Sequence, residues 1–151
     1  MVESFRDLRV YKRAFRAAQT IFQNSEAWPE EERYALTDQI RRSSRSVFAN
    51  VAEAWRKRRY PKHFVSKLSD ADAEAAETRA WLDAALGHGY IDQPSYEDLD
   101  LEYDRISGSL VKMMTSPDRW CGPAETVQED GPSYQAASLP HTPRPTDVPT
   151  R

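Results

Sequence analysis

The residues with the clearest chemical potential in this sequence are the basic side chains between Arg41 and Lys62. They form two clusters on one side of an expected helix and the turn after it: Arg41, Arg42 and Arg45, then Arg56, Lys57, Arg58, Arg59 and Lys62. The clusters are separated by roughly 15–20 Å at helical rise. Guanidinium groups bind phosphates and carboxylates through paired hydrogen bonds. The clusters therefore fit either a nucleic-acid backbone or an acidic neighbouring subunit.

A row of polar residues runs beside the apolar stripe of the same helix. The stripe is Leu36, Ile40, Val47, Val51 and Ala54. The polar row, with Glu77 on the next helix, is called the polar seam here: Gln39, Ser43, Ser46, Asn50, Glu53 and Glu77. Buried polar groups need partners, and a buried Asn or Gln can fix which helices pair. We expect Asn50 to have this role, with a ligand site as the alternative.

Two large aromatic residues, Phe48 and Trp55, lie seven positions apart on one flank of this helix. Both fall outside its apolar stripe. Because large apolar groups outside a core favour association, they predict a subunit interface. No pattern of aromatic residues typical of RNA stacking is evident.

Charge is distributed unevenly along the chain. Residues 41–67 contain nine Lys and Arg but only one acid, whereas residues 70–104 contain eleven acids but only one base. The net charge of −3 by itself indicates no partner. The asymmetry is compatible with nucleic-acid binding, with contact between the basic face of one subunit and the acidic face of another, or with two solvated faces.

Catalytic and metal sites are weakly indicated. The three histidines lack acids at di-iron spacing, and no zinc, phosphate-loop or nucleophile motif is present. One acidic set resembles the magnesium ligands of all-α nucleotide pyrophosphohydrolases: Glu74, Glu77, Glu97 and Asp100. Antiparallel helices would offset these acids along the axis by roughly 5–10 Å. We therefore expect no enzyme activity, catalytic residue, metal or cofactor, and keep the hydrolase as a remote alternative.

Periodicity predicts four helices in residues 1–116, arranged as an all-α, antiparallel up-down bundle. The first spans about residues 5–23, with an apolar face of Leu8, Tyr11, Phe15, Ala18 and Phe22. The second begins at Pro29 or at Thr37, and Tyr60-Pro61 ends it. The third covers residues 61–86 with a heptad pattern of Phe64, Leu68, Ala71, Ala75, Thr78, Leu82 and Ala85. The fourth begins near Pro94 and presents Leu99, Tyr103, Ile106, Leu110 and Met113.

Residues 117–151 contain seven of the ten prolines and few large apolar residues. Such a composition predicts a disordered, proline-rich C-terminal tail. No apolar run is long enough to cross a membrane, no signal-peptide core is present, and Cys121 is the single cysteine. We expect a cytoplasmic protein without a membrane partner.

Several motifs closely resemble the four helix bundle protein family, also called the 23S rRNA intervening-sequence proteins. The most specific are Gln39-Ile-Arg-Arg-Ser43 and Ala49-Asn-Val-Ala-Glu53, supported by Phe5-x-x-Leu8-x-Val-Tyr11 and Gly89-Tyr-Ile91. The resemblance covers about residues 5–114. It implies an antiparallel four-helix bundle, a homopentamer, and no catalytic residues. A remote relative implied by the same resemblance assists a reverse transcriptase by binding it and nucleic acid.

The sequence thus predicts a non-enzymatic, oligomeric four-helix-bundle protein that binds RNA or DNA through its arginine clusters. The alternative is a purely structural or protein-interaction oligomer, including an accessory subunit of a reverse transcriptase.

Overall fold

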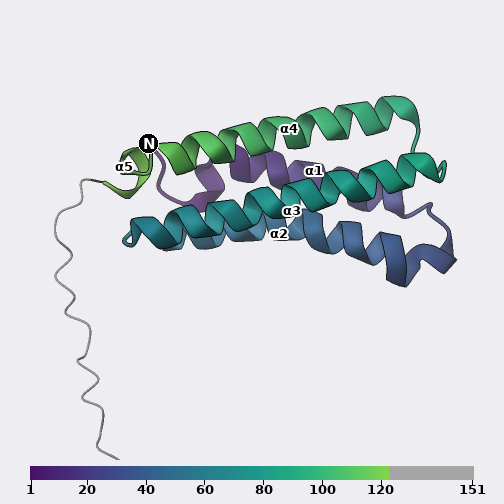
Figure 1. The fold of residues 1–151 in the computed structure, drawn as a ribbon, viewed down its shortest axis with the longest axis horizontal. Helices are drawn as coiled ribbons and strands as arrows, with labels where there is room; N and C mark the ends of the chain where they lie inside the picture. The colour runs from purple at the N-terminus through teal and green to yellow at the C-terminus, as the bar shows by residue number, and fades with distance from the viewer. Residues whose placement is uncertain (123–151) are drawn as a thin grey trace, which may run out of the picture.

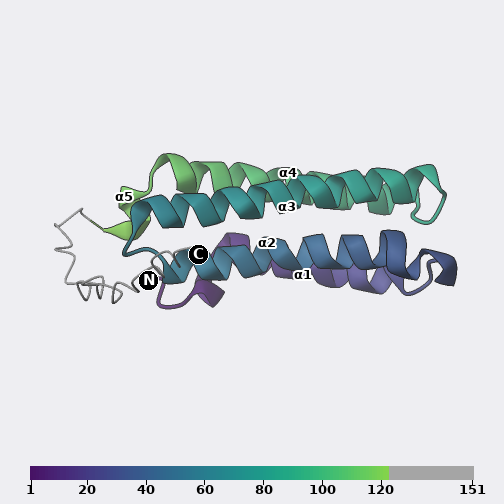
Figure 2. The same ribbon diagram turned by 60° about the horizontal axis from the view of Figure 1, so that its bottom comes forward.

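The computed structural model describes residues 1–122, and this part of the chain contains helices and no strand. The long helices are α1 (Arg9–Ser25), α2 (Asp38–Arg56), α3 (Pro61–Gly87) and α4 (Gln93–Thr115). They run alternately in opposite directions along one axis (Figure 1). Each packs against its neighbours in sequence, and α1 also contacts α4. Figure 2 shows α3 and α4 as one layer against α1 and α2. The predicted all-α antiparallel four-helix bundle is confirmed.

Short-range signals set the helix boundaries. Ser4 and Asp7 form a reciprocal capping box around the 3₁₀ turn η1 (Phe5–Asp7), which leads into α1. Pro61 opens α3 after the extended Tyr60, as the proline signal predicts. Gly89 has a φ of +75°, a conformation that favours glycine, just after the end of α3. The Asp92 carboxylate caps α4 by accepting a 2.8 Å hydrogen bond from the Ser95 amide.

The apolar stripes of the second, third and fourth helices are confirmed as the core. All five members of the α2 stripe are buried, as are all seven heptad positions of α3 and all five predicted positions of α4. Four of the α3 positions, Ala71, Ala75, Thr78 and Ala85, have small side chains, which allows close helix packing. None of the helices in residues 1–122 combines the length and apolarity needed to span a bilayer.

The predicted apolar face of the first helix is partly wrong. The buried positions of α1 are Val10, Ala14, Ala17, Ala18, Ile21 and Ser25. Phe15 and Phe22 remain 40% and 37% exposed. The small residues allow α1 to lie close to its neighbours, so the larger aromatic rings fall on the flank of the interface with α2. The prediction placed the largest residues in the core, but at this position the helices pack too closely for them, and alanines are buried instead.

The second helix begins gradually. Residues after Pro29 form a 3₁₀ turn, η2 (Glu30–Glu32), and a π-helical turn, η3 (Arg33–Thr37), that leads directly into α2. Thr37 is buried, has helical dihedral angles and makes no capping bond. The α-helix itself therefore begins directly after Thr37, while helical turns of other types extend back to the residue after Pro29, so each predicted start marks a boundary in the structure.

The bundle continues past the predicted boundary at residue 116. Asp118–Cys121 form the short helix α5, which contacts α3. The Trp120 ring lies edge-on to Trp55, with their centroids 6.4 Å apart. Residues 117–122 of the expected tail are therefore ordered against the bundle, because Trp120 supplies apolar surface to cover. The remaining expected tail, residues 123–151, lies outside the described residues.

Candidate nucleic-acid interface

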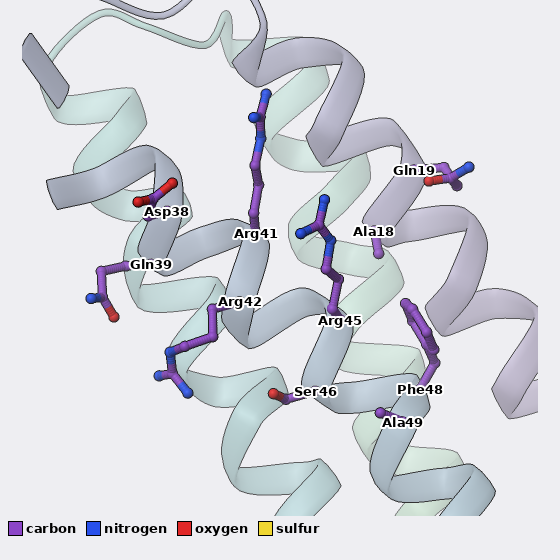
Figure 3. A pocket seen from close by; sticks show the side chains of 10 residues that line it. All are labelled: Ala18, Gln19, Asp38, Gln39, Arg41, Arg42, Arg45, Ser46, Phe48 and Ala49. Carbon is purple, nitrogen blue, oxygen red and sulfur yellow. The ribbon is translucent and has the colours of Figure 1, made fainter. Parts of the chain in front are cut away.

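The three arginines of the first cluster point to two sides of α2, because neighbouring residues of a helix project in directions about 100° apart. Figure 3 shows Arg41 and Arg45 on the side of α2 that faces α1, while Arg42 points to the other side. The Arg41 side chain donates a 2.9 Å hydrogen bond to the Ser25 hydroxyl and lies over the Phe22 ring. These contacts connect α2 to the end of α1. Arg41, predicted to contact a phosphate or a neighbouring subunit, thus makes its contacts within the bundle.

Arg42 makes the opposite connection, to α3. Its guanidinium lies 2.9 Å from a Glu77 carboxylate oxygen and 3.9 Å from Glu74. Burial and the neighbouring Glu77 raise the pKa of Glu74 above its ordinary value, while Arg42 opposes that rise. Arg42 is thus paired with acidic side chains of its own bundle. Arg45 alone of this cluster is exposed and has no ion-pair partner within residues 1–122.

A shallow groove of about 760 Å³ follows the outer side of α2 past these arginines (Figure 3). Asp38 and Gln39 lie at one end of the groove, and Phe48 and Ala49 lie at the other. Ala18 and Gln19 of α1 form its border. The groove brings Arg41, Arg42 and Arg45 to one depression, but two of the three make hydrogen bonds or ion pairs inside the protein.

The polar seam lies where α2 meets α3. At its centre the buried Thr78 hydroxyl donates a 2.9 Å hydrogen bond to the buried Ser43 hydroxyl. Glu77 accepts hydrogen bonds from Arg42 and from the Trp81 indole. The Ser43–Thr78 and Arg42–Glu77 hydrogen bonds cross from α2 to α3, whereas the Trp81 bond lies within α3. This part of the seam therefore joins the two helices.

Other members of the seam make local or surface contacts. The half-buried Asn50 donates to the Ser46 carbonyl of its own helix at 2.9 Å, and within residues 1–122 its side chain makes no hydrogen bond to another helix. Glu53 is exposed and lies 3.1 Å from Lys67 of α3. Gln39 and Ser46 are half-buried and border the groove. The Ser43–Thr78 pair, not Asn50, is the buried polar contact between these helices, and the Arg42–Glu77 and Glu53–Lys67 pairs join them nearer the surface.

The two aromatic residues expected at a subunit interface have different positions. Phe48 is half-buried and packs on Phe15, with ring centroids 5.2 Å apart. Trp55 is only 6% exposed, lies against Trp120 and is covered by the Arg58 guanidinium at 3.4 Å from its ring centroid. The expected interface role of Trp55 is therefore corrected: Trp55 is a core residue, because Trp120 and Arg58 cover it.

The second basic cluster lies at one end of the bundle, together with cations from other segments. The start of α1, the end of α2, the start of α3, the end of α4 and α5 all meet there (Figure 1). We call the exposed cations of these segments the basic end: Arg6, Arg9, Lys12, Arg56, Lys57, Arg59, Lys62, Lys112 and Arg119. Within residues 1–122 none of these nine forms an ion pair. Arg58, over Trp55, is half-buried among them.

Few acids offset this charge locally. Glu53 and Asp70 are both close to Lys67, and the Asp7 carboxylate accepts hydrogen bonds from two backbone amides. Those amides lower the pKa of Asp7, so it stays ionised. Glu3 and Asp118 are the other acids in these segments. This end therefore carries an excess of exposed cations, the kind of charge that attracts phosphate groups.

Sequence reasoning located only part of this surface. It identified the segment from Arg56 to Lys62. It missed the contributions from the start of α1, the end of α4 and α5, including Arg9, Lys112 and Arg119. Their proximity follows from the up-down topology, in which the first and last helices place these residues beside the turn between α2 and α3. Combining the predicted topology with the charge pattern would have found them.

The acids considered as magnesium ligands lie in two separate groups. Glu74 and Glu77 surround Arg42, while Asp100 forms a 2.8 Å ion pair with Arg79. That carboxylate raises the pKa of Arg79. Glu97 accepts a hydrogen bond from Gln93. Across residues 1–122, no group of three or more His, Cys, Asp or Glu side chains is placed to hold a metal ion.

Comparison with known proteins gives a consistent family assignment. The chain is similar to a solved structure, a protein of unknown function of the S23 ribosomal protein family from Bacteroides thetaiotaomicron. The two share 26% identity with a TM-score of 0.62, over 70% of this chain and 97% of the other. No curated protein matches the chain. The family model of the 23S rRNA-intervening sequence protein matches residues 6–112, which span almost the whole bundle. The chain therefore belongs to the 23S rRNA-intervening sequence protein family.

Proposed function

We propose that this protein is a non-enzymatic, oligomeric helical-bundle protein that binds RNA through its basic end. The observation that carries the proposal is the convergence of nine exposed cations, without ion-pair partners in residues 1–122, at one end of the fold. A polyanion gains affinity at such a surface by releasing condensed counterions. The family name supports an association with ribosomal RNA genes but assigns no molecular activity.

The opposite end of the bundle favours a directed mode of binding. Exposed acids collect there from the loop after α1, the end of α3 and the start of α4: Glu26, Glu30, Glu31, Asp83, Asp92, Glu97 and Asp98. These acids repel phosphates, so an RNA strand should contact the basic end and avoid the other. The arginine groove lies toward the acidic end, and its Arg41 and Arg42 are held by Ser25 and Glu77. We therefore assign the main phosphate contacts to the basic end, with Arg45 as an additional contact.

The second candidate function is a protein-interaction oligomer, and it rests on a different surface. An aromatic row along the outer side of α1 and α2 consists of Tyr11, Phe15 and Phe48, whose rings pack on one another. Phe22 lies further along α1, where Arg41 and Arg45 lie over its ring. Phe15 and Phe22 are among the largest exposed apolar groups of the described chain. Such a row is suited to contact with another copy of the chain. A homopentamer, as the family resemblance implies, is compatible with RNA binding because the row and the basic end are separate surfaces.

Charge reversal at the basic end tests the RNA proposal. The double variant Arg56→Glu/Arg59→Glu should bind a labelled single-stranded RNA at least tenfold more weakly, because each reversal removes a phosphate contact and adds repulsion. The slope of log affinity against log salt should become shallower by about two phosphate contacts. Fluorescence anisotropy at several potassium chloride concentrations measures both quantities.

A matched control is Arg16→Glu/Arg105→Glu. Both residues are exposed in the middle of α1 and α4, have no ion pair within the described residues, and give the same change in net charge. The control should keep most of the affinity, and sedimentation velocity should give both variants the wild-type oligomer. If Arg56→Glu/Arg59→Glu dissociates the oligomer and the wild-type protein shows no salt-sensitive RNA binding, the structural-oligomer function is the correct one.

A further inference from the structure

A second cavity lies within the basic end, between the start of α1, the end of α4 and α5. Its volume is about 400 Å³, toward the lower end of the range typical of small-molecule sites. Leu8, Val10 and Met113 form an apolar base, and all three are buried. The Trp120 indole forms part of the wall.

Three cations surround this apolar cavity: Arg9, Lys112 and Arg119. All are exposed, and none has an ion-pair partner in the part of the chain that the structure describes. Asp7 and Ser109 are the other polar residues in the lining. Since Asp7 is held by the backbone amides of Glu3 and Ser4, its carboxylate is already engaged in the turn. The cavity thus combines an apolar, aromatic interior with a cationic rim.

The aromatic wall is held in place before any ligand arrives. Trp120 lies edge-on to the buried Trp55, and Trp55 is covered in turn by Arg58. A side chain that is already ordered loses little conformational entropy on binding. Indole rings stack with nucleobases of any sequence, with a contribution of about 1–3 kcal/mol per base.

We propose that this cavity, which we call the terminal pocket, binds the terminal nucleotide of a nucleic-acid strand, with the base against Trp120 and the phosphate between Arg9, Lys112 and Arg119. The size suits one nucleotide, and the neighbouring cations of the basic end are placed to follow the rest of the strand. This inference deepens the RNA-binding function proposed above and rests on it for the source of the nucleotide. It adds a preference for strand ends, which a uniform phosphate-binding surface does not have.

The first test measures a single nucleotide on the full chain. Adenosine monophosphate should bind more tightly than either adenosine or inorganic phosphate, because only the nucleotide fills both the apolar interior and the cationic rim. Titration calorimetry gives the affinities. The indole N–H signal of Trp120, assigned with the Trp120→Phe variant, should shift on addition of the nucleotide. Equal binding of benzoate would indicate a general site for aromatic anions and would overturn the assignment to nucleotides.

Variants of the rim test the location. Lys112→Gln/Arg119→Gln should weaken binding of adenosine monophosphate about tenfold or more, since two charge-assisted contacts are lost. Arg16→Gln/Arg105→Gln removes the same charge outside the pocket and should leave that affinity unchanged. Unchanged binding in Lys112→Gln/Arg119→Gln, with a folded protein by circular dichroism, would place the nucleotide elsewhere and overturn the proposal.

A comparison of linear and circular RNA of the same sequence separates the two proposals. Linear RNA should bind more tightly, and the difference should disappear in Lys112→Gln/Arg119→Gln. If both forms bind equally with steep salt dependence, the RNA function stands and the terminal pocket is refuted. If adenosine monophosphate binds but neither RNA does, the cavity is a site for free nucleotides, and both the RNA function and the preference for strand ends are refuted.

Discussion

Glu74 is the carboxylate most affected by packing between α2 and α3. One of its oxygens is buried without a hydrogen-bond partner in the described structure, and its side chain is 23% exposed. The nearest guanidinium, Arg42, is 3.9 Å away and lies closer to Glu77. Loss of hydration and the adjacent Glu77 both disfavour the charged form, so the pKa of Glu74 is raised.

This raised pKa predicts a pH-dependent cost to stability. The folded protein holds the proton more tightly than the unfolded chain, whose Glu has an ordinary pKa of 4.5. The cost is absent below that unfolded pKa and develops as the pH rises through the folded pKa. Glu74→Gln should therefore increase the free energy of unfolding at neutral pH, and the gain should vanish in acid. Urea unfolding across this pH range measures it.

Glu77→Gln is the matched control for that prediction. It weakens the shorter contact with Arg42 but also removes the charge that disfavours ionised Glu74, so these opposing effects should leave stability at neutral pH within about 1 kcal/mol of wild type. A stability difference between Glu74→Gln and the wild-type protein that does not change with pH would contradict the explanation from the raised pKa.

Individual residue contacts were only partly predictable from spacing. The polar seam correctly placed Ser43 and Glu77 at the contact of two helices, because a polar row beside an apolar stripe must meet a neighbour. It did not distinguish Ser43, which bonds to Thr78, from Asn50, which bonds within its own helix. That difference depends on rotamers and on the depth of each position, which a sequence pattern does not contain.

At the scale of elements, α1 shows how a face can be misassigned. The predicted face followed the large aromatic rings, although a second row of alanines and aliphatic residues lies beside it at helical spacing. The bundle buries the second, in which Ala14 is fully buried, while Phe15 is 40% exposed. By contrast, the stripes of α3 and α4 were predicted residue by residue, since their large apolar groups occur at a single set of heptad positions.

Neighbouring substitutions in α1 test this assignment. Ala14→Leu should destabilise the fold by about 1–3 kcal/mol, because the extra carbon atoms have no space in the core. Phe15→Glu should cost about 1 kcal/mol through lost contacts with Tyr11 and Phe48. If the aromatic row joins subunits, Phe15→Glu should also dissociate the oligomer. Urea unfolding and sedimentation velocity measure the two effects, and a larger loss of stability in Phe15→Glu would restore the originally predicted face.

At the scale of the whole molecule, charge separates along the bundle axis. The sequence indicated a basic segment followed by an acidic one, but the antiparallel course of the chain redistributes both. Arg41 lies toward the acidic end near Ser25, whereas Arg56 lies at the basic end beside η1. Arg9 at the start of α1 and Arg119 in α5 then join Arg56. The topology and the charge of each segment were both predictable from the sequence. The basic end becomes apparent only when the charged segments are placed on that topology.

The contact of α5 with the bundle gives the last prediction. Without residues 117–122, Trp55 would lose the ring of Trp120 that now lies against it. A chain ending at residue 116 should therefore be less stable than one ending at residue 122, by about 1–2 kcal/mol for the apolar surface exposed. Its tryptophan fluorescence should shift to longer wavelength as Trp55 becomes hydrated. In the full chain, Trp120→Ala should reproduce most of this loss, whereas Arg119→Ala, one residue earlier on the exposed side of α5, should not. Equal stability of the two shortened chains would mean that Trp55 is adequately covered by Arg58 alone, and that α5 adds no stability to the bundle.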